Sequence, residues 1–98
     1  MRSMRNVPGM KHLNIRVSGR VQGVFYRHSA HKYAEELGIR GFVRNESDGS
    51  VYMEVEGEDE AIGKFIEWAG RGPVFAGVSK IEIVENGLKN FSEFKIEH

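Results

Sequence analysis

The chain has 98 residues, 14 basic and 14 acidic side chains and no cysteine. This length suits one domain with a single core, and the lack of cysteine excludes a disulfide framework and a thiolate nucleophile. Because the charges cancel and no run of about 18 apolar residues occurs, nothing favours nucleic acid, an anionic membrane or a transmembrane helix. We therefore expect a cytoplasmic protein, monomeric by default, that binds neither nucleic acid nor membrane.

The chain begins with a polar, aperiodic stretch over residues 1–10 that contains a Pro-Gly pair. We predict a disordered extension there and one domain over residues 11–98. In residues 11–18, apolar side chains alternate with polar ones, which predicts a half-buried strand. From about Phe25 to Leu37 the apolar residues recur at helical spacing, which predicts a helix that is followed by a glycine cap.

The turn between these elements, GRVQGVFYR at residues 19–27, has a glycine at its start and another at its middle. Glycine lets successive backbone N–H groups point into one concavity, and the helix N-terminus adds unpaired donors and a partial positive charge. Such a turn suits a phosphate-sized anion, and the planar guanidinium of Arg27 can donate hydrogen bonds to two phosphate oxygens at once. Taken alone, a turn of this kind is more often only a turn, and it is neither a P-loop nor a dinucleotide fingerprint.

A hairpin is predicted next, because two apolar-alternating stretches flank an Asp-Gly turn at residues 48–49. The first strand covers residues 41–45 and the second begins at Val51 and ends at Gly57. Antiparallel pairing places Asn45 at the turn end of this hairpin.

The remaining chain predicts a helix with an acidic first turn from Glu58 and an apolar stripe that ends at Ala69. A glycine-rich turn over residues 70–77, a strand over 78–85 and a short strand over 94–96 follow. The order strand, helix, strand, strand, helix, strand predicts an α+β fold of the ferredoxin-like split βαβ type. Its sheet is mostly antiparallel, with two helices on one face. Many functions share this topology, so it does not predict an activity.

Two motifs carry a resemblance to a known family. GRVQGVxYR at residues 19–27 and GFVxNxxDGxVxxxVxG at residues 41–57 closely resemble the two signatures of the acylphosphatase family, and the similarity extends from about Leu13 to the C-terminus. Two long motifs in the right order and spacing are far more specific than either alone. The resemblance implies hydrolysis of small-molecule acyl phosphates to carboxylate and inorganic phosphate, without metal or cofactor.

The resemblance also implies the roles of two side chains. Arg27 would bind the phosphoryl group, and Asn45 would orient the attacking water. From the residues alone, Arg27 also fits a surface arginine paired with an acid, and Asn45 fits a turn residue that tolerates a left-handed φ. The residues whose backbone N–H groups would help to bind the phosphate are Arg20, Val21, Gln22, Gly23 and Val24. We expect the side chains of Arg20 and Gln22 to shape the turn and face solvent.

Other interpretations remain beside this one. His28 and His31 stand at i, i+3, but no third ligand is indicated, so we expect surface histidines and no metal site. The proton acceptor is open, and an oxygen of the substrate's phosphate is a candidate. An RNA-binding sheet would need exposed aromatic residues on adjacent strands, and Tyr52 is the only clear one. A domain detached from a larger carbamoyl-transfer enzyme is a further alternative, which the lack of zinc-ligand cysteines and the end of the chain after the last strand make less favoured.

Overall fold

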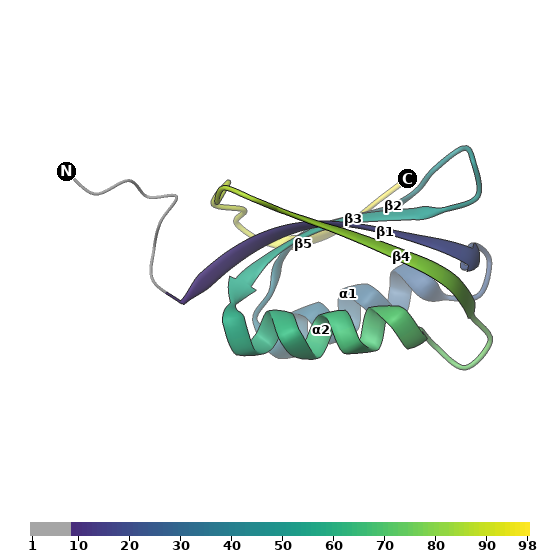
Figure 1. Cartoon of the computed structure of the whole chain (residues 1–98), viewed down its shortest axis with the longest axis horizontal. Coiled ribbons are helices and arrows are strands. Elements are labelled where there is room, and N and C mark those ends of the chain that lie inside the picture. Colours follow the sequence, from purple (N-terminus) through teal and green to yellow (C-terminus); the bar gives the residue numbers. More distant parts are fainter. Residues whose placement is uncertain (1–8) are drawn as a thin grey trace.

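The computed structural model describes residues 9–98, so the predicted extension over residues 1–10 lies mostly outside the described residues. The elements in chain order are β1 (Met10–Arg20), α1 (Tyr26–Leu37), β2 (Arg40–Asn45), β3 (Val51–Glu58), α2 (Asp59–Arg71), β4 (Gly77–Asn86) and β5 (Phe94–Glu97). Both helices cover the same face of one sheet (Figure 1). This arrangement confirms the predicted α+β, ferredoxin-like fold.

The sheet has five strands in the order β4-β1-β3-β2-β5. β1 pairs antiparallel with β3 and β4, and β2 pairs antiparallel with β3. The short β5 joins the edge and pairs parallel with β2. The alternation predicted for β1 is confirmed, because Ile15 and Val17 are fully buried beneath the helices.

The predicted element boundaries differ most at the end of α2. We expected a turn from Gly70, whereas the helix continues through Gly70 to Arg71. The N–H of Gly72 donates to the carbonyl of Trp68, 2.6 Å away, which closes the last turn. Buried Ala69 holds this turn against the core. Tertiary packing thus outweighs the weak helix propensity of one glycine, which is about 1 kcal/mol.

The end of β1 depends on a close contact between backbones at Gly19. The β1–β4 register shifts between Ser18 and Gly19, where φ is 118°. A Cβ at Gly19 would lie 2.3 Å from the carbonyl oxygen of Gly77, so only glycine fits without displacing β4. This irregularity directs the chain out of the sheet and into the turn that precedes α1.

The connection between β4 and β5 lies against the sheet face opposite the helices. Two carboxylates, those of Glu54 and Glu56, hold it there. Glu56 accepts N–H groups from three successive residues, at 2.6, 3.1 and 2.8 Å. Glu54 accepts the Tyr52 hydroxyl at 2.8 Å and the Lys89 ammonium at 3.0 Å, and its Oε1 lies 2.9 Å from His12 Nε2. His12 is completely buried.

The ionisation of Glu54 gives a prediction for stability. Burial acts to raise the pKa of Glu54, but hydrogen bonds from Lys89, Tyr52 and His12 outweigh it and hold the pKa below its ordinary value. A lowered carboxyl pKa stabilises the fold above the ordinary pKa, and this contribution is lost as the pH falls through the folded-state value. We expect Glu54→Gln to lower the free energy of unfolding by about 2 kcal/mol at neutral pH and by less near pH 3.

Urea titrations at the two pH values measure this difference. Glu85→Gln, which changes an exposed carboxylate of β4, serves as the matched control and should leave both values unchanged. An equal loss for Glu54→Gln at both pH values would show that the charge of Glu54 has no part in its contribution.

Candidate active site

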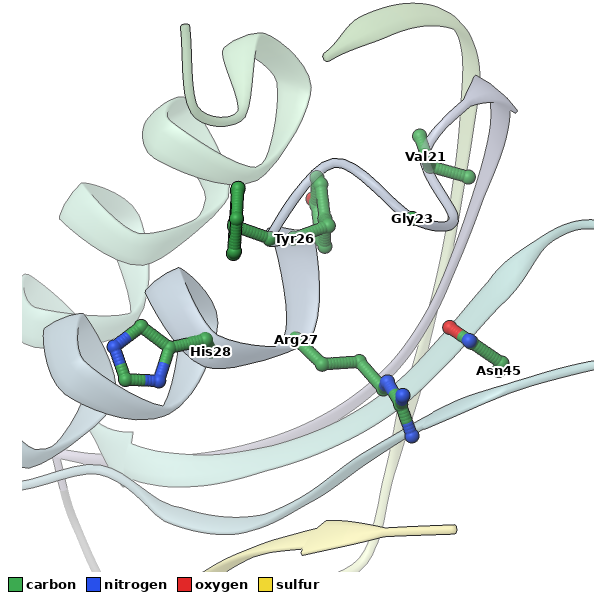
Figure 2. A pocket seen from close by; sticks show the side chains of 7 residues that line it. Val21, Gly23, Tyr26, Arg27, His28 and Asn45 are labelled. Atoms are coloured by element: carbon green, nitrogen blue, oxygen red, sulfur yellow. The ribbon is translucent and has the colours of Figure 1, made fainter. Parts of the chain in front are cut away.

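The turn between β1 and α1 forms one wall of a cavity of about 250 Å³. The cavity is lined by Val21, Gly23, Phe25, Tyr26, Arg27, His28 and Asn45. Arg27 stands in the first turn of α1, and Asn45 is the last residue of β2. Figure 2 shows their side chains extending from these two elements into the same space and toward each other. The fold thus brings the two predicted catalytic residues together.

The guanidinium of Arg27 is held by the end of β5. Its Nη1 donates to the carbonyl oxygen of Glu97 at 3.0 Å and lies 3.3 Å from Nδ1 of His98. Because β5 is paired with β2, this contact ties the guanidinium to the strand that carries Asn45. No carboxylate approaches Arg27 within ion-pair distance among residues 9–98, so its charge is available to an anion.

Asn45 has a polar atom that the fold leaves unsatisfied. Its side-chain Oδ1 is buried and has no hydrogen-bond partner among the described residues. A buried acceptor without a partner costs about 1–3 kcal/mol, so natural folds keep few of them. A small donor bound in the cavity would satisfy this oxygen.

The turn that contributes Val21 and Gly23 to the cavity lining also has backbone N–H groups without a partner. Among the hydrogen bonds of residues 9–98, none is donated by an N–H group of residues 21–24. The first bond of α1 runs from the N–H of Ser29 to the carbonyl of Phe25, at 3.0 Å. Gly23 has a φ of 75°, and nothing lies within 4 Å of the position where a Cβ would stand. The turn therefore presents unpaired N–H groups beside open space, as an anion site requires.

The other residues predicted for the phosphate site lie beside the cavity rather than in its lining. Arg20 is exposed and paired with Gly77 in the sheet, and Val24 packs partly against the core. The side chain of Gln22 does not face solvent as we expected. Its Nε2 donates to the carbonyl oxygens of Glu46, at 2.7 Å, and Ser50, at 2.9 Å. Gln22 thus joins the turn to the hairpin beyond Asn45.

The hairpin tip is itself held by side-chain contacts. Asp48 Oδ1 accepts the N–H of Ser50 at 2.9 Å and its hydroxyl at 2.6 Å, and these hydrogen bonds hold the pKa of Asp48 below its ordinary value. Arg16 Nη1 donates to the Ser50 hydroxyl oxygen at 3.0 Å. These contacts hold the backbone of the hairpin turn that follows Asn45.

Besides Arg27, two titratable groups of the described chain line the cavity. Burial raises the pKa of Tyr26 far above its ordinary value, so the phenol stays protonated and donates to the carbonyl of Ala69 at 2.7 Å. His28 is exposed, and Figure 2 shows its imidazole on the far side of the helix turn from Asn45. No carboxylate is among the residues of the described chain that line the cavity. Neither Tyr26 nor His28 is therefore placed as a general base beside Asn45.

The face opposite the helices differs from our expectation of one aromatic residue. Phe42 of β2 lies beside Tyr52 of β3, with ring centroids 6.0 Å apart. We missed Phe42 because residue spacing alone did not show which face of β2 is buried. The guanidinium of Arg44 lies over both rings and donates to Glu46 at 2.7 Å. The positive charge of Arg44 is thus already paired with an acid, and the absence of nucleic-acid binding stays a prediction.

No group of three or more histidine, cysteine, aspartate or glutamate residues within residues 9–98 is arranged to hold a metal ion. Nε2 of His31 lies 3.5 Å from Oε2 of Glu35 on the surface of α1. Neither helix in this part of the chain has the length and apolar character needed to cross a bilayer.

Comparison with known proteins agrees with this architecture. The acylphosphatase family model matches residues 13–96. A protein named acylphosphatase from Thiobacillus denitrificans is 46% identical over 76 residues, which cover 78% of this chain and 85% of that protein. The structure of an acylphosphatase from Coxiella burnetii superposes with a TM-score of 0.87 at 38% identity and covers 91% of this chain and 94% of that one. Full-length HypF, in a phosphate- and nucleotide-bound form, contains a similar region that covers 95% of this chain but 12% of HypF, with a TM-score of 0.86 at 32% identity. The matched motifs, the fold and these relatives show that the chain belongs to the acylphosphatase family.

Proposed function

We propose that this protein hydrolyses the carboxyl–phosphate bond of acyl phosphates to a carboxylate and inorganic phosphate, without a metal ion or cofactor. Family membership supports the reaction. The observation that carries the mechanism is that Arg27 and Asn45, supplied by different elements, line one cavity beside a turn with unpaired N–H groups.

The chemistry of the substrate makes this small set of groups sufficient. A carboxylate is a good leaving group that needs little protonation at neutral pH. A catalyst must therefore hold the phosphoryl group, offset its charge and place a water molecule in line with the bond that breaks. Positioning and electrostatic stabilisation meet these demands without a nucleophilic side chain.

Arg27 is the group that binds the phosphoryl oxygens. Its guanidinium donates two parallel hydrogen bonds, and the N–H groups of residues 21–24 donate to the remaining oxygens. The carbonyl of Glu97, 3.0 Å from Nη1, holds the fork in place before substrate arrives. Preorganised donors of this kind cost little rearrangement during the reaction.

Asn45 is the group that positions the water. An amide is a very poor base, so its contribution is geometric: the unsatisfied Oδ1 accepts a hydrogen bond from the water and directs its lone pair at phosphorus. Because Tyr26 stays protonated and His28 points away, an oxygen of the substrate's own phosphoryl group accepts the water's proton. His28→Gln should accordingly keep both the rate and its pH profile, and a lost limb in that profile would assign the proton to His28.

The reaction itself is tested by phosphate release from benzoyl phosphate in excess EDTA. We expect full activity in the chelator and much slower release from p-nitrophenyl phosphate, whose leaving group is a phenolate rather than a carboxylate. Release at the spontaneous rate would overturn the proposed reaction, and activity restored only by added divalent metal would overturn its metal independence.

The side chain of Gln22 is expected to act through the geometry of the site. Gln22→Ala removes both hydrogen bonds to the hairpin, so the turn with its N–H groups moves relative to Asn45. We expect kcat/KM for benzoyl phosphate to fall about tenfold and the free energy of unfolding to fall by about 1 kcal/mol. Steady-state kinetics and urea unfolding measure the two effects. A variant that loses stability but keeps kcat/KM would show that the link serves the fold alone.

A further inference from the structure

Phe25 is a large apolar residue that lines the cavity yet contributes little to the core. Its side chain is 69% exposed, whereas the other apolar lining residues, Val21 and Tyr26, are each 1% exposed. Among the apolar residues that line the cavity in the described chain, Phe25 is therefore the one with exposed surface that a bound molecule can contact. A single exposed apolar residue needs no explanation by itself, but this one borders the proposed site.

The backbone of Phe25 supplies a second, independent observation. Phe25 is the N-cap of α1 in a left-handed conformation, with φ 66° and ψ 21°, and its side chain makes no capping hydrogen bond. Glycine or asparagine adopts this conformation with less strain, and both are better caps than phenylalanine. Neither burial nor capping offsets the strain at Phe25, and uncompensated strain of this kind is concentrated at functional sites.

The direction of the reaction places the acyl group near this residue. In an in-line displacement the leaving group departs opposite the attacking water. Figure 2 shows Asn45, which holds the water in the proposed mechanism, on one side of the Arg27 side chain and Tyr26, at the start of α1, on the other. Phe25 lines the same cavity as Asn45 and Arg27 and is the N-cap of α1, so a leaving group that departs away from Asn45 and toward the start of the helix comes within reach of its exposed ring.

We propose that Phe25 determines specificity, and that it selects acyl phosphates with an aromatic or extended apolar acyl group over those with a small or charged one. This inference rests on the proposed function. An aromatic acyl group gains a ring contact and covers apolar surface on Phe25, whereas an acetyl group offers one methyl. A charged acyl group finds no arginine or lysine besides Arg27 in the described lining, and Arg27 is engaged by the phosphoryl group.

The test compares benzoyl phosphate with acetyl phosphate in wild type, Phe25→Asn and Phe25→Tyr. Asparagine tolerates the left-handed backbone, so the first variant removes the ring without adding strain. We expect the ratio of kcat/KM values, benzoyl over acetyl, to fall about five- to tenfold in Phe25→Asn and to stay within about twofold in Phe25→Tyr. The ratio of inhibition constants, benzylphosphonate over methylphosphonate, should rise by the same factor in Phe25→Asn.

Phe75→Asn is the matched control, because Phe75 is also 69% exposed but does not line the cavity. Its ratio should equal that of wild type. An unchanged ratio in active Phe25→Asn, or an equal fall in Phe75→Asn, would overturn this inference while leaving the proposed function intact. Failure of the proposed function would look different, since wild type would then hydrolyse neither substrate.

Discussion

Arg27→Ala is expected to lower kcat/KM for benzoyl phosphate by about 1,000-fold. The phosphoryl oxygens carry negative charge in the ground state and in the transition state, so the loss should appear in both KM and kcat. No other arginine or lysine among residues 9–98 lines the cavity, and the N–H groups of residues 21–24 carry only partial charges. The inhibition constant of inorganic phosphate should rise in parallel.

Two further variants test whether Arg27 acts through the shape of its guanidinium, through its local charge or through a long-range field. Arg27→Lys restores a positive charge without the planar fork and should recover only part of the loss. Lys32→Ala removes one positive charge from an exposed position on the same helix and should change kcat/KM by no more than about twofold. If Lys32→Ala and Arg27→Ala lose the same activity, the effect of Arg27 is a long-range field and not phosphoryl binding.

Asn45→Ala should lower kcat by about 100- to 1,000-fold while KM and the inhibition constant of phosphate stay within about twofold. The amide contacts the water and not the phosphoryl group in the proposed mechanism, so its removal affects turnover and spares affinity. The stability of Asn45→Ala, in contrast to its turnover, should not fall. Alanine removes a buried oxygen that has no partner, so the melting temperature should stay constant or rise.

Asn14→Ala is a closely matched control for Asn45→Ala. Asn14 is the other residue in the described chain with a buried, unpartnered Oδ1, and it lies on the sheet face away from the helices. Asn14→Ala should share any gain in stability and leave kcat unchanged. A loss of phosphate affinity in Asn45→Ala as large as the loss of kcat would assign Asn45 to phosphoryl binding and remove its role in placing the water.

Contacts across the sheet explain why parts of the site escaped sequence-based prediction. Gln22 reaches a carbonyl 24 residues away, and Arg27 reaches one 70 residues away. Neither partner is a side chain, so no residue type at these positions signals the contact. Neither the exposure of Phe25 nor its left-handed backbone could be predicted from the sequence. Helical spacing predicts which face of a helix is buried, but not the conformation of the residue that precedes the helix.

Alternation of apolar and polar residues, the two long motifs and the glycines by themselves determined the order of elements, the ferredoxin-like fold and the family. These signals are local: each reports which side of a strand or helix is buried, or which backbone turn is allowed. Only the tertiary structure decided that Arg27 and Asn45 share a cavity, that β5 holds the guanidinium and that Gln22 ties the turn to the hairpin. The physical reason is that hydrogen bonds between distant segments depend on sheet register and strand order, which arise from packing of the whole chain.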